Sequence, residues 1–93
     1  MSLPREQRPA AIRAALEAAL APEALEIIDE SHKHAGHAGA RDGRGHFKVA
    51  ITSAAFAGQL PLARHRQVYQ ALGSLMDTDI HALSIQARAP GEG

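Results

Sequence analysis

The sequence contains no cysteine and no tryptophan, and only 3% of its 93 residues are aromatic. Without cysteine, the chain cannot form a disulfide, use a thiol nucleophile or hold an iron–sulfur cluster through thiolates of its own. Hydrophobic residues still make up 45% of the sequence, so a core has to be built mainly from Leu, Ile, Val and Ala. The length predicts one domain over residues 1–93.

Long apolar runs and a net charge are also missing. No run approaches the roughly 20 residues that span a bilayer, and the first ten residues, MSLPREQRPA, contain no apolar segment typical of a secretory signal. We therefore expect a cytoplasmic protein without a membrane partner. The formal net charge is zero, which argues against a general nucleic-acid binder.

The charges are nevertheless unevenly placed. Residues 31–76 contain six Lys and Arg residues and a single acidic residue, Asp42. Such a basic segment is either a solvated surface or a face that binds an acidic partner.

A helix near the N-terminus is predicted by three apolar residues at i, i+4 and i+8 spacing, Ile12, Leu16 and Leu20. Pro4 suits the first turn of this helix, and Ser2 could cap it. Pro22 disfavours helical geometry at the preceding residue, so the helix should stop at Ala21.

A second helix should begin at Pro61, which favours a first helical position. Six apolar residues fill one arc of about 140° on its surface, and they are Leu62, Val68, Tyr69, Leu72, Leu75 and Met76. His65 falls inside this arc, Arg64 and Arg66 flank it, and residues 77–79 should break the helix.

Strands are predicted over residues 24–30, 46–52 and 80–88, the last two by alternation of apolar and polar residues. A helical turn is expected at 53–58, a flexible His/Gly-rich loop at about 31–45 and a disordered tail at about 89–93. The order α-β-β-α-α-β indicates an α+β fold, with helices packed on one face of a three-stranded sheet.

The stretch SHKHAGH places His32, His34 and His37 within seven residues. Neutral imidazoles at this density can bind a divalent metal. Because a glycine-rich segment follows, spacing alone favours an exposed polar loop without a metal.

His65 lies in the apolar arc of a helix, where it is either a partly buried histidine with one hydrogen bond or a ligand held by the helix. Arg64 and Arg66 beside it can hydrogen-bond a carboxylate of a partner. His46 and His81, at the starts of strands, are interpreted as structural. The sequence contains no serine-triad, dinucleotide-binding or P-loop pattern.

Four stretches together resemble the BolA family: DESHKHAGH (29–37), GHFKVAITSAAFAG (45–58), PLARHRQVYQAL (61–72) and IHALSIQARAP (80–90). The resemblance implies a class II KH-like fold. It also implies a non-enzymatic protein that pairs with a monothiol glutaredoxin and shares a [2Fe-2S] cluster with it, in iron–sulfur cluster assembly, trafficking or iron regulation.

In this family the glutaredoxin cysteine and a glutathione supply the thiolates, and the BolA-like chain supplies histidine. The resemblance assigns that role to His65 and to His34, with His32 and His37 as substitutes. Arg64 and Arg66 would then contact the partner. The chain departs from the family at Leu60, where a Ser or Thr is common and would cap the helix.

Two other functions remain open at this point. One is a DNA-binding transcriptional regulator of stress response or morphology, with residues 54–72 as a helix-turn-helix-like pair and Lys48, Arg64 and Arg66 on the DNA. The other is a histidine-based metal-binding stress protein without a cluster. The sequence leaves open whether the isolated chain is a monomer or a homodimer.

Overall fold

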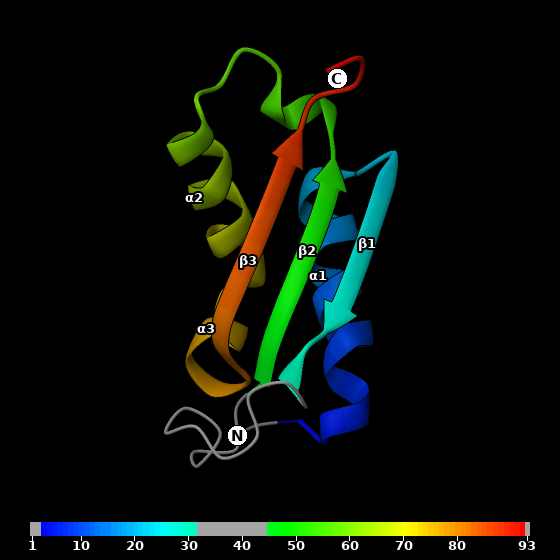
Figure 1. The fold of residues 1–93 in the computed structure, drawn as a ribbon, viewed down its shortest axis with the longest axis vertical. Coiled ribbons are helices and arrows are strands. Elements are labelled where there is room, and N and C mark those ends of the chain that lie inside the picture. Colours follow the sequence, from blue (N-terminus) through cyan, green and yellow to red (C-terminus); the bar gives the residue numbers. More distant parts are fainter. Residues whose placement is uncertain (1–2, 32–44, 93) are drawn as a thin grey trace.

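The computed structural model describes residues 3–31 and 45–92, and the order of its elements agrees with the predicted order (Figure 1). The helices are η1 (Arg5–Gln7), α1 (Arg8–Leu20), η4 (Ala54–Phe56), α2 (Pro61–Leu72) and α3 (Leu75–Thr78). The strands are β1 (Ala24–Asp29), β2 (Gly45–Thr52) and β3 (Ile80–Arg88). In the described part, no helix has the length and apolar character needed to cross a membrane.

The sheet has the order β1-β2-β3 and is mixed. β1 pairs antiparallel with β2, and β2 pairs parallel with β3. The parallel pair requires a crossover connection, which η4, α2 and α3 provide. The α-helices lie on one face of the sheet, and β1 and β3 are its two edges (Figure 1).

The core lies between this sheet face and the helices. The alternation predicted for β2 is confirmed, because Phe47, Val49 and Ile51 are at most 2% exposed. They pack with Ile12, Leu16 and Leu20 of α1, Phe56 of η4, Val68 and Leu72 of α2, and Ile80 of β3. The apolar stripe predicted for the first helix is therefore the stripe that packs on the sheet.

The start of the first helix was predicted too early. Residues 5–7 form the 3-10 turn η1, and regular helix begins at Arg8, so that Pro9 occupies the first-turn position that the sequence suggested for Pro4. The end was predicted correctly, since Ala21 adopts a left-handed conformation with a φ of 43° directly before Pro22. Ser2 lies outside the described residues.

The apolar arc predicted for the second helix is only partly buried. Val68 and Leu72 face the core, whereas Leu62 and Tyr69 are 63% and 41% exposed. The helix also ends at Gly73, whose φ of 54° suits glycine, and a separate short helix, α3, carries the remaining apolar residues. The buried stripe of α2 is thus narrower than the apolar stripe of the sequence.

The end of the chain corrects the predicted disordered tail. Ala89 is buried, and the N–H of Glu92 donates to its carbonyl oxygen over 3.2 Å. Pro90 and Gly91 stand at the two central positions of this turn, and Gly91 has a φ of 85°. Pro followed by a positive-φ Gly is the pattern of a type II turn, so residues 89–92 form a defined turn.

Candidate functional site

The exposed side of α2 carries an unusual set of residues. Leu62, His65, Arg66 and Tyr69 follow each other at i, i+3, i+4 and i+7, so they lie along one side of the helix. His65 is half-buried, and the other three are exposed. We name these four residues the outer face of α2.

Leu60, the N-cap of α2, extends the exposed apolar surface beside the outer face. It is 77% exposed and makes no side-chain hydrogen bond to the helix, as expected for a leucine at that position. Of the exposed large hydrophobic side chains in the described part, only Ile28 lies away from α2. An apolar surface rimmed by polar groups is typical of an interaction site.

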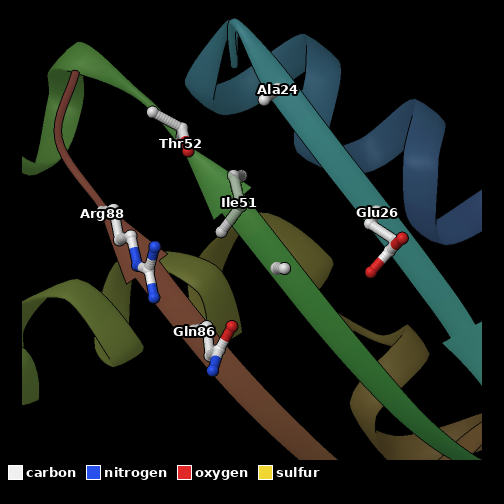
Figure 2. Close-up of a pocket in the computed structure, with 7 residues that line it drawn as sticks. Ala24, Glu26, Ile51, Thr52, Gln86 and Arg88 are labelled. Carbon is white, nitrogen blue, oxygen red and sulfur yellow. The ribbon is translucent and has the colours of Figure 1, made fainter. Parts of the chain in front are cut away.

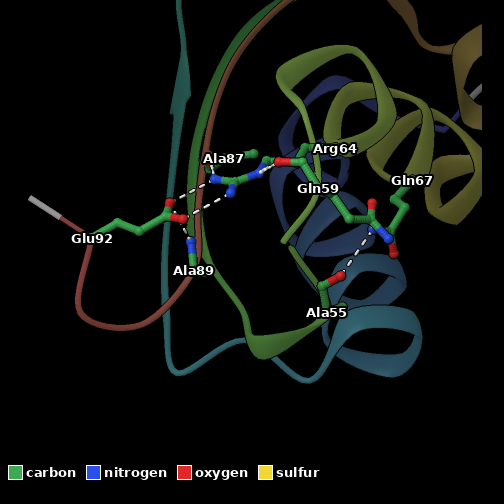
Figure 3. A network of polar contacts seen from close by, with 7 residues as sticks. All are labelled: Ala55, Gln59, Arg64, Gln67, Ala87, Ala89 and Glu92. Carbon is green, nitrogen blue, oxygen red and sulfur yellow. Dashed lines mark hydrogen bonds and ion pairs between the residues drawn. The ribbon is translucent and has the colours of Figure 1, made fainter. Parts of the chain in front are cut away.

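The two arginines beside His65 have different surroundings. Arg66 is exposed and forms no ion pair with a described residue. Arg64, in contrast, donates four hydrogen bonds within the chain (Figure 3). Its Nε donates to the Gln59 carbonyl oxygen over 2.8 Å, and its Nη1 donates to the Ala87 carbonyl oxygen over 3.1 Å.

The remaining two bonds of Arg64 form a bidentate pair with Glu92. Nη1 and Nη2 donate to Oε1 and Oε2 over 2.6 and 2.8 Å. The backbone N–H of Ala89 also donates to Oε1 over 2.9 Å. These bonds connect the first turn of α2 to the end of β3 and to the turn that follows it.

This pairing changes the pKa of both groups. The hydrogen bond from Arg64, followed by the one from the Ala89 N–H, lowers the pKa of Glu92 from 4.5 to about 2. The same hydrogen bond to Glu92 raises the pKa of Arg64 above its ordinary value. Both side chains are therefore charged at neutral pH, and the predicted partner contact of Arg64 would have to compete with these bonds.

A second histidine site lies at the opposite end of β3. The rings of His46 and His81 are 5.2 Å apart between centroids and tilted by 55°. A register shift between Gly45 and His46 pairs Ile80 with Gly45 and Ala82 with His46, so His81 lies at an irregularity of the ladder and is exposed. Sequence reasoning treated both histidines as structural. Parallel pairing of these two strands, each with a histidine as its second residue, is the signal that could have predicted their contact.

The predicted loop ligands His34, His32 and His37 lie outside the described residues. The residues that border this segment are placed. His46 N–H donates to Ser31 Oγ over 3.1 Å, and the N–H of Gly45 donates to the Asp79 carbonyl oxygen over 2.8 Å. The two residues that border the segment, Ser31 and Gly45, therefore lie at the same end of the sheet, where β3 begins and His81 lies.

His65 is farther from this end of the sheet. Its neighbour Arg64 contacts Ala87, which is six residues from His81 along β3, or about 20 Å at 3.3 Å per residue. His34 is three residues beyond Ser31, which allows at most about 11 Å of extended chain. The chain length from Ser31 therefore favours His81 over His65 as the histidine that pairs with His34.

The three cations suggested for DNA binding do not share a surface. Phe47 and Val49 point to the helices, so Lys48 between them lies on the helix-free face of the sheet. Arg64 and Arg66 belong to α2 on the other side. The segment suggested as a helix-turn-helix-like pair consists of the three-residue η4 and α2.

The helix-free face holds a shallow pocket of about 270 Å³, shown in Figure 2. It is lined by Ala24, Glu26, Ala50, Ile51, Thr52, Gln86 and Arg88. The side chains of Glu26 on β1 and of Gln86 and Arg88 on β3 flank the central strand (Figure 2). None of the residues predicted for metal, partner or DNA lines this pocket.

Comparison with known proteins decides the family. The sequence matches the BolA-like protein family over residues 16–92. The chain belongs to the BolA family. It is 49% identical over 83 residues to BolA-like protein 1 of Mus musculus, covering 89% of this chain and 58% of the mouse protein. It is 41% identical over 70 residues to the DNA-binding transcriptional regulator BolA of Escherichia coli strain K12, covering 75% of this chain and 64% of that protein.

Solved structures of BolA proteins confirm the α+β fold. The BolA domain of SufE1 from Arabidopsis thaliana matches with a TM-score of 0.83 and 39% identity, covering 99% of this chain and all of that domain. The solution structure of BolA1 from Mus musculus matches with a TM-score of 0.73 and 48% identity, covering 96% of this chain and 68% of that one.

In this BolA chain, the described residues contain no group of three His, Asp or Glu side chains close enough to hold a metal ion. Among the described histidines, the half-buried His65 and the exposed His81 lie toward opposite ends of β3.

Proposed function

We propose that this BolA-family chain is a non-enzymatic partner of a monothiol glutaredoxin and contributes histidine to a [2Fe-2S] cluster shared by the two proteins. The glutaredoxin cysteine and a glutathione would supply the thiolates that this cysteine-free chain lacks. The role would be cluster assembly, cluster trafficking or iron regulation. A cytoplasmic location suits this proposal, because glutathione keeps thiols reduced there.

The observation that carries the proposal is the outer face of α2. It combines exposed apolar side chains, the cation Arg66, which forms no ion pair with a described residue, and the half-buried imidazole of His65. Aromatic, apolar and arginine side chains are enriched at protein–protein interfaces. The positive charge of Arg66 favours an acidic partner surface and would increase the rate of association.

The arrangement of histidines supports a change in the expected ligand pair. The residues that border the predicted loop, Ser31 and Gly45, lie at the end of the sheet where β3 begins with His81, and His65 is farther away. We therefore infer that His81 and a loop histidine are the ligands, and that His65 belongs to the docking surface. The pair His65 and His34, which the family resemblance suggested, is the competing assignment.

The two assignments are separated by variants of the reconstituted heterocomplex. His81→Ala should abolish the visible circular dichroism of the histidine-ligated cluster. His65→Ala should leave the shape of that spectrum unchanged and weaken association. His34→Ala should alter the spectrum less than His81→Ala, because His32 or His37 can replace it.

Far-ultraviolet circular dichroism of each variant controls for folding, and the exposed Gln70→Ala on α2 is a matched surface control. Loss of the cluster spectrum in folded His65→Ala, with His81→Ala unchanged, would restore the first assignment. A chain that forms no complex with the cognate monothiol glutaredoxin under anaerobic conditions would contradict the proposed function itself.

A second candidate, DNA binding, is favoured by one observation, the similarity to the E. coli regulator. The separation of Lys48 from Arg64 and Arg66 counts against a continuous basic surface. We expect affinity for duplex DNA to be weak, with a salt slope of about −0.9 per phosphate neutralised and only a few phosphates involved. Sub-micromolar, sequence-selective binding at physiological salt in a fluorescence anisotropy titration would favour the regulator.

A further inference from the structure

The first turn of α2 lacks the usual means of fixing a helix start. Its N-cap residue is Leu60, whose side chain cannot accept a hydrogen bond from the first free N–H groups of the helix. Pro61 restricts the backbone but brings no donor. A helix start without a cap frays more readily than a capped one, and this start carries the Arg-His-Arg triplet.

Arg64 supplies contacts that a cap does not. Its Nε bond to the Gln59 carbonyl oxygen ties the helix to the residues that precede it. Its Nη1 bond to the Ala87 carbonyl oxygen ties the same turn to β3. The side chain is 13% exposed, so most of it is enclosed by the fold.

Glu92 holds the guanidinium in the position from which it makes these bonds. The turn with Pro90 and Gly91 at its centre returns the carboxylate to Arg64, and the Ala89 N–H orients one carboxylate oxygen. The pair is bidentate, with both nitrogen–oxygen distances below 2.9 Å. A bidentate arginine–carboxylate pair fixes the orientation of the guanidinium plane as well as its position.

We propose that Arg64 and Glu92 are positioning residues that hold the first turn of α2 against the end of β3, so that the outer face of α2 is presented in one orientation to a partner. The two arginines of the triplet then have separate roles, because Arg64 binds within the chain and Arg66 contacts the partner. The division of roles rests on the proposed function. The positioning of α2 concerns the isolated chain and stands without it.

The first experiment uses the isolated chain. Glu92→Gln and Arg64→Gln should each increase amide hydrogen exchange in the first turn of α2, and the double variant should show no more than the larger single effect. Arg64→Lys should rescue little, because a lysine ammonium cannot form the bidentate pair. Arg66→Gln is the matched control and should leave exchange unchanged. Unchanged exchange in Glu92→Gln would overturn the positioning role.

The second experiment measures association with the cognate monothiol glutaredoxin at several salt concentrations. Glu92→Gln and Arg64→Gln should weaken binding by roughly 2- to 5-fold, as expected for a surface ion pair, mainly through faster dissociation and with the wild-type salt dependence. Arg66→Gln should slow association and make it less dependent on salt.

Two outcomes would overturn the division of roles. Tighter binding by Glu92→Gln would show that Glu92 withholds Arg64 from the partner. Equal losses of salt dependence in Arg64→Gln and Arg66→Gln would show that both arginines contact it. Absence of any complex for the wild-type chain contradicts the proposed function, whereas the exchange experiment still tests the positioning of α2.

Discussion

The two ends of β3 are each held by an arginine–carboxylate pair, and the pairs differ in burial. At the start of the strand, Arg8 Nε donates to Asp79 Oδ2 over 3.0 Å, with side chains only 6% and 2% exposed. At the end of the strand, Arg64 pairs with Glu92, whose side chain is 42% exposed. The same two chemical groups therefore operate in different dielectric surroundings.

At the buried end, several contacts depend on one carboxylate. Asp79 also accepts hydrogen bonds from the Leu3 N–H over 2.7 Å and from the Thr78 hydroxyl. Burial acts to raise the pKa of Asp79, but the hydrogen bonds from Thr78, Leu3 and Arg8 outweigh it and leave that pKa below its ordinary value. The carboxylate of Asp79 therefore connects Leu3 and the start of α1 to the start of β3, and removing it leaves Arg8 without its counter-charge.

At the exposed end, the contacts are distributed over more groups. The buried Ser53 Oγ donates to the Leu20 carbonyl oxygen and accepts from the Ala55 N–H, which connects α1 to η4 independently of Arg64. The comparison teaches that the buried pair supports the whole fold, whereas the exposed pair sets the local orientation of one helix.

The largest expected effect is at the buried end. Asp79→Ala leaves the Arg8 guanidinium buried without its counter-charge, and such a loss costs about 3–5 kcal/mol of unfolding free energy. Urea denaturation followed by circular dichroism measures it. The exposed neighbour Asp77 is the control, since Asp77→Ala should change stability by no more than about 0.5 kcal/mol. Equal effects of the two variants would contradict the contrast between the ends.

A smaller and opposite effect is expected at the exposed end. Leu60→Ser adds an N-cap to α2 and should stabilise the chain by about 0.5–1 kcal/mol. Because Leu60 is 77% exposed, little buried apolar area is lost. Leu60→Ala is the matched control, because it removes the same side chain without adding a cap. A lower melting temperature for Leu60→Ser than for Leu60→Ala would contradict the capping argument.

The smallest expected effect concerns the pH dependence of the exposed pair. The pKa of Glu92 in the folded chain is lowered to about 2, so its contribution to stability is fully present above its ordinary pKa of 4.5 and is lost as the pH falls toward 2. Glu92→Gln should therefore be less stable than the wild type at pH 6, and the difference should vanish near pH 2.

Denaturation midpoints at both pH values test this prediction, with the exposed Glu23→Gln as a control for removal of one carboxylate. A difference between wild type and Glu92→Gln that persists unchanged at pH 2 would mean that the bidentate pair is not its source.

Local sequence pattern determined the secondary structure, the core-facing residues of α1 and β2, and the fold class of this protein. Apolar spacing placed α1 and β2 on the core, Pro22 ended α1, and the alternation of elements predicted a three-stranded α+β fold. These features depend on residues close in sequence, and their side chains face the core at intervals set by helix and strand geometry. The BolA family was also identifiable from sequence, because its motifs extend over four separate stretches.

Only the tertiary structure decided which apolar residues are buried and which charged residues pair with each other. Leu62 and Tyr69 share the apolar arc of α2 with Val68, yet they are exposed because the sheet covers only part of that arc. The pairing of Arg64 with Glu92 and the contact between His46 and His81 join residues 28 and 35 positions apart in the sequence. No local pattern reports such contacts, since they exist only once parallel strands and a crossover helix have brought distant segments together.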